Sequence, residues 1–358
     1  MKLPTLLISA GSPASGASFA GWRLLRSALV GAAVAAGLLA GAQVAARASD
    51  LPAPAAAEVA PEAAPAEFAT QDYDWFDAAR QRAVPVRLYL PTQVDRRRPL
   101  PLVVFSHGIG GSRRGYSYLG GYWASQGYAS LHLQHVGSDR SLWAGNVFNL
   151  VARLQGAAQE DEAFARVGDL RFALDQLLAH PELGQTIDAA RIIVAGHSYG
   201  ANTAMLAVGA RVVRGGRVVD LADSRFQAAI LLSAPPFYGE TDTARILAGI
   251  RVPTLHITAT GDVIRIPGYY SGAEDRIAVY DAISGAPKIL AVFEGGSHSM
   301  FTDRAGTGGV GLNPQVKNAT RELALAFMKS VFESEGSGLV AWPERFAGIL
   351  ARFAVSER

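Results

Sequence analysis

Six short apolar runs recur between residues 100 and 293, and within them apolar positions follow one another without polar alternation. They are LPLVVF (100–105), ASLHL (129–133), RIIVA (191–195), AAILLS (228–233), TLHIT (254–258) and KILAVF (288–293). Such runs are typical of strands in a parallel sheet that is covered on both faces. Residues 118–125, 164–178 and 315–332 have the apolar spacing of helices. The pattern predicts an α/β protein with a mostly parallel central sheet and flanking helices.

Three further segments complete the predicted organisation. Residues 72–91, with alternation at Val86, Leu88 and Leu90, are expected to form an antiparallel N-terminal hairpin. Residues 211–220 are expected to be a small surface excursion. The connection formed by residues 137–163 is longer than a crossover requires before its helix. We expect it to form helix and loop that pack on the sheet. The alternative is that it forms a cap over an active site.

The N-terminal region has the pattern of an export signal. Residues 23–48 carry two arginines, then an apolar stretch, then Ala46-Arg47-Ala48, which fits the small-x-small rule for cleavage. We expect a cleaved signal over 1–48 and a periplasmic or secreted protein without a stable membrane span, the alternative being an N-terminal membrane anchor. The Pro/Ala-rich residues 49–71 are expected to be a linker, so the folded domain should cover 72–358.

Charge and cysteine content narrow the possible functions. The 33 basic and 31 acidic side chains leave a net charge of +2 and are spread along the chain, so no nucleic-acid partner is expected. The chain has no cysteine, which excludes disulfides, thiolate metal sites and a cysteine nucleophile.

A candidate nucleophile lies in VAGHSYG, directly after the run at 191–195. Gly196-His197-Ser198-Tyr199-Gly200 has the Gly-x-Ser-x-Gly pattern between a predicted strand and a predicted helix. Glycine on both sides allows the two backbones to come close in a tight turn. The turn would lift the Ser198 hydroxyl clear of the sheet, beside the positive end of the helix.

A glycine-rich loop follows the first apolar run and offers the second element of such a site. His107-Gly108-Ile109-Gly110-Gly111 is suited to turn a backbone N–H toward a carbonyl oxygen under attack. We expect the two oxyanion donors to be the amides of Ile109 and Tyr199.

A base and an acid should follow the serine in chain order. His298 comes just after the run at 288–293, and Asp262 comes just after the run at 254–258. We predict that His298 accepts the proton of Ser198 and that Asp262 orients the imidazole. The alternatives for the acid are Asp242, Asp275 and Asp281. The other six histidines are predicted to be structural or loop residues: His107, His132, His135, His180, His197 and His256.

The motifs FSHGIGG, GHSYG, TATGD and GGSH, with DAARQRAVPVRLYLP upstream, make residues 72–332 resemble the α/β-hydrolase superfamily. The chain looks most similar to bacterial dienelactone-hydrolase and platelet-activating-factor-acetylhydrolase-like esterases. The resemblance implies the α/β-hydrolase fold and a serine esterase. Dienelactone hydrolases use a cysteine nucleophile, which this chain lacks. In the lipid-mediator acetylhydrolases the acid follows the strand after the nucleophile, where this chain reads LLSAPPF without a carboxylate.

The expected reaction is hydrolysis of a small-molecule or lipid-like carboxylic ester through an acyl-enzyme, without a metal or organic cofactor. Tyr199 is fixed beside the serine. Tyr116, Tyr118 and Trp143 are expected to pack in the core or against helices, with a place in the substrate pocket as the alternative. Polyester or lipid hydrolysis, amide or peptide cleavage, and a non-catalytic binding role on the same fold are the competing functions.

Overall fold

The computed structural model describes residues 67–95 and 97–356. The predicted export signal and residues 49–66 of the predicted linker lie outside the described residues. Within the described ranges, no helix has both the length and the apolarity needed to cross a membrane.

A nine-stranded sheet forms the centre of the domain, in the order β1-β2-β4-β3-β5-β8-β9-β12-β13. The six strands from β4 to β12 run parallel, whereas β1, β2 and β13 pair antiparallel at the two edges. This confirms the predicted fold class. The strands are β1 (Phe68–Asp77), β2 (Arg82–Pro91), β3 (Leu100–Ser106), β4 (Ala129–Leu133), β5 (Ile187–His197), β8 (Phe226–Leu232), β9 (Thr254–Ala259), β12 (Lys288–Phe293) and β13 (Leu350–Ser356).

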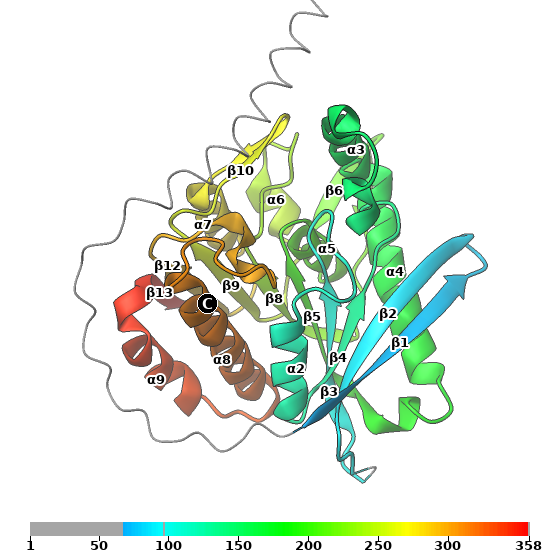
Figure 1. Cartoon of the computed structure of the whole chain (residues 1–358), viewed down its shortest axis with the longest axis vertical. Coiled ribbons are helices and arrows are strands. Elements are labelled where there is room, and N and C mark those ends of the chain that lie inside the picture. Colours follow the sequence, from blue (N-terminus) through cyan, green and yellow to red (C-terminus); the bar gives the residue numbers. More distant parts are fainter. Residues whose placement is uncertain (1–66, 96, 357–358) are drawn as a thin grey trace, which may run out of the picture. The chain divides into compact units, whose positions relative to one another are not determined.

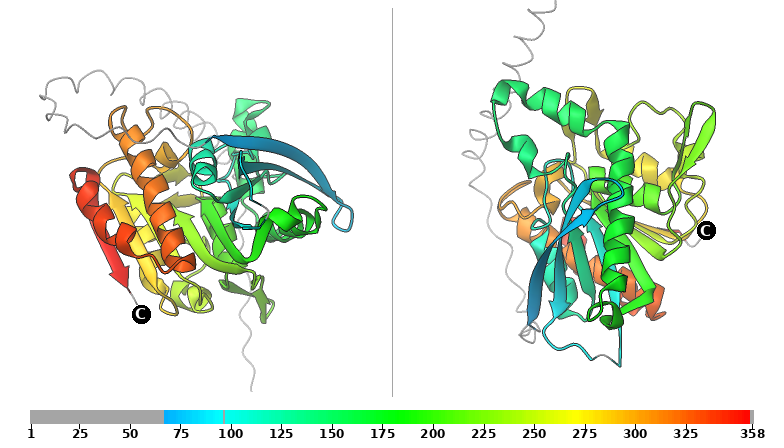
Figure 2. Two further views of the ribbon diagram at one scale, coloured as in Figure 1. Left: turned by 90° about the horizontal axis from the view of Figure 1, so that it is seen from below. Right: turned by 90° about the vertical axis from the view of Figure 1, so that its right-hand side faces the viewer.

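Helices cover both faces of the sheet (Figures 1 and 2). The apolar residues of α4, α5, α6 and α7 pack in one core, and those of α2, α8 and α9 pack in a second core on the opposite face. Burial on both sides explains why the parallel strands are apolar without alternation. The helices are α2 (Ser117–Ser125), α3 (Leu150–Ala157), α4 (Glu160–Ala179), α5 (Tyr199–Ala207), α6 (Thr243–Leu247), α7 (Ala273–Ala282), α8 (Leu312–Phe332) and α9 (Ser337–Arg345).

The hairpin at the N-terminal edge begins earlier than the sequence indicates. Strand β1 starts at Phe68, four residues before the expected domain start at residue 72, because it pairs with β2 over its whole length and Phe68 lies opposite Pro91. The Phe68 ring also lies 6.1 Å from that of Tyr89. Two small hairpins lie outside the central sheet: β6 (Arg211–Arg214) with β7 (Arg217–Asp220), and β10 (Ile264–Ile266) with β11 (Tyr269–Ser271).

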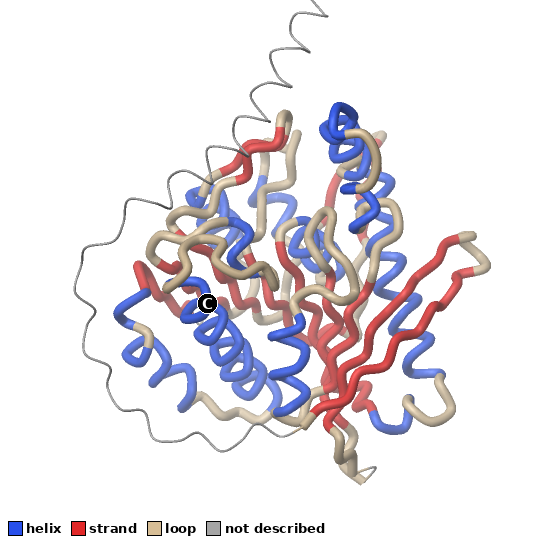
Figure 3. Tube along the Cα trace, viewed as in Figure 1, coloured by secondary structure: helices blue, strands red, loops and turns tan. Residues whose placement is uncertain are grey.

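The structure corrects the expectation that residues 137–163 pack on the sheet. Leu142, Leu154 and Ala157 form a separate apolar cluster with Ile109 of the glycine-rich loop and Ile266 of β10. We call residues 140–158, which include two short 3₁₀ turns and α3, the cap segment. Only from about residue 163, within α4, does the chain join the core beneath the sheet. Figure 3 shows α3 and the β10–β11 hairpin on the same side of the domain, beyond the ends of the central strands.

Close backbone approach fixes the centre of the sheet. A Cβ on Gly196 would overlap the carbonyl oxygen of Gly200, and a Cβ on Gly200 would overlap the carbonyl oxygen of Ser106. The end of β3, the end of β5 and the start of α5 are therefore in direct contact. Glycine at both positions allows this contact because it has no side chain.

Gly200→Ala should lower the free energy of unfolding by about 3 kcal/mol, because the added methyl group meets backbone atoms that cannot rotate away. Urea denaturation of the purified protein would measure this change. The control is Gly156→Ala in α3, where the added carbon meets no atom within 4 Å. That variant should be as stable as the wild type or up to about 1 kcal/mol more stable. Equal effects of the two substitutions would contradict the role of the close contact.

Candidate active site

Ser198 lies in the sharp turn between β5 and α5. Its backbone has φ 56° and ψ −123°, a conformation that non-glycine residues rarely adopt. The turn points the side chain away from the sheet at the N-terminus of α5. Because the first amides of a helix have no intrahelical partner, this position favours a developing negative charge.

His298 lies at the end of the loop that follows β12, where Gly295 and Gly296 have positive φ angles. Its Nε2 atom lies 2.8 Å from Ser198 Oγ, and its Nδ1 atom lies 2.8 Å from Asp262 Oδ1. The three residues that the sequence analysis selects are thus in hydrogen-bond contact, although 100 positions separate Ser198 from His298. With Nδ1–H donating to the carboxylate, Nε2 is free to accept the serine proton.

Asp262 follows β9 and is fully buried. Its Oδ2 atom accepts hydrogen bonds from the hydroxyls of Ser233 and Thr258, and the Arg276 guanidinium lies 3.6 Å from Oδ1. Burial alone would raise the pKa of this carboxyl group. The hydrogen bond and electrostatic interaction with the His298 ring, the charge of Arg276 and the Ser233 hydroxyl outweigh burial and hold the pKa well below its usual value.

The three alternative acids have other positions. Asp242 caps the N-terminus of α6 through the Arg245 amide, and Asp275 accepts a hydrogen bond from the Gly272 amide at the start of α7. Asp281 belongs to the last turn of α7. None of them contacts His298 within the described part of the chain.

Ser233 belongs to this site, and the sequence analysis missed it. It directly follows β8, at the place where the acid of the lipid-mediator acetylhydrolases is expected, and is fully buried with φ 51°. Its hydroxyl oxygen lies 2.7 Å from His298 Nδ1, while its proton is donated to Asp262. The SAPP sequence after an apolar run was the only signal, and a serine there indicates little without the neighbouring strands.

The glycine-rich loop leaves one amide available. The amides of Gly108, Gly110 and Gly111 donate to the Tyr116 hydroxyl, the Ser138 carbonyl and the Gly108 carbonyl, respectively. Within the described ranges, the amides of Ile109 and Tyr199 donate to no hydrogen-bond acceptor. These are the two amides that the sequence analysis assigns to an oxyanion.

His197 connects the loop to the candidate base. Gly108 donates its N–H to the Tyr116 hydroxyl, which lies 2.8 Å from His197 Nδ1, and His197 Nε2 lies 3.0 Å from the carbonyl oxygen of His298. Because a carbonyl can only accept, Nε2 carries the proton and Nδ1 accepts from Tyr116. Burial lowers the pKa of His197 to about 3, so the ring stays neutral and keeps these two roles.

The other five histidines hold structural or loop positions, as the sequence pattern indicates. His132 and His256 lie within strands, where burial lowers the pKa of each to about 3. His107 and His135 are also fully buried, and burial holds the pKa of each well below its usual value. His180 ends α4 and accepts from nearby backbone amides.

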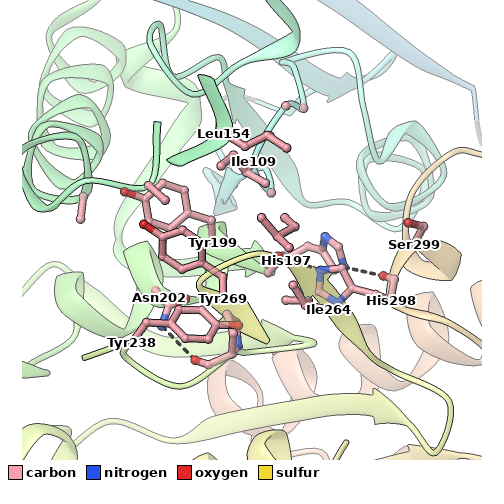
Figure 4. A pocket seen from close by; sticks show the side chains of 18 of the residues that line it. Ile109, Leu154, His197, Tyr199, Asn202, Tyr238, Ile264, Tyr269, His298 and Ser299 are labelled. Atoms are coloured by element: carbon pink, nitrogen blue, oxygen red, sulfur yellow. Dashed lines mark hydrogen bonds between the residues drawn. The ribbon is translucent and has the colours of Figure 1, made fainter. Parts of the chain in front are cut away.

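A cavity of about 750 Å³ opens beside Ser198. Its walls are mostly apolar and come from the glycine-rich loop, the cap segment, the segment after β8 and the β10–β11 hairpin. Figure 4 shows Tyr199, Tyr238 and Tyr269 on one side of the cavity and His298 on the other. Tyr116 and Trp143 also line it, whereas Tyr118 packs in the core and donates to the Phe301 carbonyl. Trp143 donates its indole N–H to the Gly110 carbonyl, so the cap segment rests directly on the loop.

Comparison with known proteins gives one family match, in the N-terminal part of the described domain. The family model described as platelet-activating factor acetylhydrolase, isoform II, matches residues 83–155, from β2 through the glycine-rich loop to α3. The chain has the α/β-hydrolase fold. The match supports a hydrolase of the lipase and esterase type, although it covers about a fifth of the chain and ends before Ser198. The chain matches no curated protein.

In this hydrolase fold, Tyr116→Phe should weaken the connection between the loop and the histidine. The substitution leaves His197 Nδ1 and the Gly108 N–H without partners in a buried setting, so the free energy of unfolding should fall by about 1–3 kcal/mol. Urea denaturation measures this loss. The control is Tyr118→Phe, which removes only the bond to the Phe301 carbonyl and leaves His197 untouched. A Tyr116→Phe variant with wild-type stability would contradict the described chain of bonds.

The neutral buried histidines predict a loss of stability in acid. The unfolded chain protonates each histidine below about pH 6.5, whereas folded His256 stays neutral until about pH 3. The unfolded state therefore binds more protons in this window, and the free energy of unfolding falls as the pH decreases. In His256→Gln the fall between pH 6 and pH 4.5 should be shallower by about 1 kcal/mol per pH unit. The pH dependence of the two proteins should be the same above pH 7. Parallel curves throughout would show that His256 is not buried as a neutral ring.

Proposed function

We propose that the protein is a serine hydrolase that cleaves carboxylic esters through an acyl-enzyme. In this proposal Ser198 is the nucleophile, His298 is the general base and acid, and Asp262 orients the imidazole. The amides of Ile109 and Tyr199 hold the oxyanion. The observation that carries the proposal is the continuous path from Ser198 Oγ through His298 to the buried Asp262 carboxylate, with two contacts of 2.8 Å.

The reaction follows from the proton positions. His298 Nε2 takes the Ser198 proton as the hydroxyl oxygen attacks the ester carbonyl, and the carboxylate of Asp262 stabilises the resulting imidazolium. The carbonyl oxygen becomes an anion that two amides can bind. The imidazolium then protonates the leaving alcohol as the ester C–O bond breaks, and the acyl group stays on Ser198 Oγ. The neutral ring next takes a proton from water as the water oxygen attacks the acyl carbon. The bond from that carbon to Ser198 Oγ then breaks, the imidazolium returns its proton to Oγ, and the carboxylic acid leaves. These groups need no metal or organic cofactor.

The cavity indicates the class of ester. A volume of about 750 Å³ with mostly apolar walls exceeds what an acetyl group needs, and Ile264, Tyr238 and Tyr269 lie along it. We therefore propose a substrate with an apolar acyl or alcohol portion of several carbons or an aromatic ring.

The assignment of the nucleophile and acid predicts two large losses of activity. Ser198→Ala should abolish covalent labelling by a fluorophosphonate and lower kcat for p-nitrophenyl butyrate by about 10⁶-fold. Asp262→Asn should lower kcat by about 10⁴-fold, because the amide cannot hold the imidazole in the required tautomer. The matched control is Asp242→Asn, which changes only the cap of α6 and should leave kcat within about twofold of the wild-type value.

A substrate panel separates ester cleavage from its competitors. p-Nitrophenyl esters of increasing acyl length should be hydrolysed, whereas an aminoacyl p-nitroanilide should not. Turnover of the anilide alone would identify an amidase or peptidase. Absence of both turnover and fluorophosphonate labelling in the wild type would favour a binding protein on the same fold.

A second candidate is hydrolysis at a lipid or polyester surface. Phe148 in the cap segment is 87 % exposed, and Tyr270 in the β10–β11 hairpin is 68 % exposed, and both segments contribute other residues, Trp143 and Tyr269 among them, to the cavity wall. Exposed aromatic side chains on segments that line a cavity favour contact with an apolar surface. Faster hydrolysis of an emulsified long-chain ester than of the same ester in solution would support this function.

Export is proposed on the sequence pattern of residues 23–48 alone. Cell fractionation and N-terminal sequencing of the mature protein would test it, with cleavage near Ala48 as the expected result. The same experiment would distinguish a cleaved signal from a membrane anchor.

A further inference from the structure

Arg166, in the first half of α4, is fully buried next to the candidate oxyanion donors. Its guanidinium donates to the hydroxyls of Thr203, Ser138 and Ser106, at 2.9, 2.8 and 3.0 Å, and also to the carbonyl oxygen of His107. The guanidinium carbon lies 4.5 Å from the centre of the Tyr199 ring. One side chain thus joins the start of the glycine-rich loop, the segment after β4 and the helix that follows Ser198.

The contacts of Arg166 lie on both sides of the Ile109 amide along the loop. Arg166 holds the carbonyl of His107, two residues before Ile109. On the other side, the Gly110 amide donates to the Ser138 carbonyl at 2.8 Å, and the hydroxyl of Ser138 is itself a partner of Arg166. The residues on both sides of the Gly108–Ile109 pair are therefore fixed. Arg166 holds His107 directly and holds Gly110 through Ser138. The Ile109 N–H remains without an acceptor between them.

The second donor is held through Thr203. Its hydroxyl accepts from Arg166 Nε and donates to the carbonyl oxygen of Tyr199 at 3.0 Å. The Tyr199 ring lies against the same guanidinium. Each peptide unit that carries a proposed oxyanion donor therefore has a neighbouring peptide unit whose carbonyl is held by Arg166, directly at His107 and through Thr203 at Tyr199.

The three hydroxyls around Arg166 can only act as acceptors toward it. Thr203 donates to Tyr199, and Ser138 donates to Glu162 Oε1 at 2.6 Å. Ser106 Oγ lies 2.9 Å from His135 Nε2, and His135 Nδ1 lies 3.0 Å from Asp169. Since His135 Nδ1–H donates to this carboxylate, Nε2 must accept the Ser106 proton. Each hydroxyl proton is committed elsewhere, so each oxygen presents a lone pair to the guanidinium.

The set of Ser106, His135 and Asp169 repeats the order of groups seen at Ser198, but all three side chains are fully buried. A substrate cannot reach them, so the set orients a hydroxyl rather than activating it. The carboxylates of this region, Asp169 and Glu162, form ion pairs with Arg82. In the described ranges Arg166 itself has no ion pair. Burial lowers the pKa of Arg166 to about 10, so it remains a cation at neutral pH.

We propose that Arg166 is a positioning residue that holds the two oxyanion-binding amides in place and supplies an unpaired positive charge behind them. The inference rests on the proposed serine hydrolase. A carboxylate partner would neutralise the field of the guanidinium, whereas neutral hydroxyls fix its position and leave the charge directed at a developing oxyanion. The side chain therefore acts on the transition state and has little effect on ground-state binding.

The test compares Arg166→Met and Arg166→Lys with the wild type, using p-nitrophenyl butyrate. We expect Arg166→Met to lower kcat by about 10²-fold with KM changed by less than about threefold, since one misplaced oxyanion donor has an effect of this size. Arg166→Lys keeps the charge but cannot reach all four acceptors, so it should recover part of the loss. The control is Arg171→Met on the same helix, which donates only to the Ala222 carbonyl and should retain wild-type kcat.

Inhibitors distinguish positioning of the amides from a general structural role. An alkyl trifluoromethyl ketone forms an oxyanion with the serine, whereas the matching secondary alcohol binds without one. In Arg166→Met the inhibition constant of the ketone should rise by about the same factor as kcat falls, and that of the alcohol should not change. Equal increases for both inhibitors, or wild-type kcat in a folded variant, would overturn the inference.

Two milder variants carry the test if Arg166 variants fail to fold. Thr203→Val and Ser138→Ala each remove one acceptor of the guanidinium, and each should lower kcat about three- to tenfold at constant KM. Wild-type kcat in both would also overturn the inference. An active wild type with unaffected variants would refute only this proposal. A wild type that hydrolyses no ester and is not labelled at Ser198 would refute the proposed function and, with it, this inference.

Discussion

The close approach of three backbone segments is the constraint on which the site depends. The ends of β3 and β5 and the start of α5 meet where Gly196 and Gly200 have no side chain. This contact sets the distance between the loop that begins at His107 and the turn that contains Ser198. The hydrogen bonds of Arg166 with the His107 carbonyl and the Thr203 hydroxyl join the same two segments.

The site contains two buried charged groups, Asp262 and Arg166, which are stabilised by different kinds of contacts. Asp262 receives two hydroxyl donors, the His298 ring and a nearby guanidinium, which together keep it ionised despite its burial. Arg166 receives hydroxyl and carbonyl acceptors but no carboxylate contact in the described ranges. In the proposed reaction, the negative charge of Asp262 lies behind the imidazole that would become positive, and the positive charge of Arg166 lies behind the amides that would bind the oxyanion. Such a fixed arrangement avoids reorganisation during the reaction.

Several features of the molecule could be predicted because they depend on local pattern. The apolar runs mark the parallel strands, the glycine spacing marks the turn at Ser198, and chain order with strand ends selects Asp262 and His298. Ser233 could not be predicted, because its role requires that the ends of β8 and β9 meet the loop before His298. The contact of Tyr116 with His197 spans 81 positions and has no sequence signature.

The packing of the cap segment could not be predicted from the sequence, for a different reason. Its apolar residues Leu142, Leu154 and Ala157 would satisfy packing on the sheet or packing on the glycine-rich loop equally well, since both surfaces are apolar. Only the position of Ile109 and Ile266 in space decides between them. Arg166 was likewise indistinguishable from a surface arginine of an amphipathic helix, because the hydroxyls that surround it come from three distant segments.

The separation of the cap segment from the central cores has a consequence for divergence among related proteins. Its apolar cluster is distinct from the two clusters that stabilise the sheet, yet it forms one wall of the cavity. Substitutions in this wall can alter which molecules enter the cavity without a direct contact to His298 or Asp262, whereas Trp143 and Ile109 also connect the wall to the glycine-rich loop. The architecture therefore allows substrate selectivity to differ among related proteins that share the same proposed base and acid.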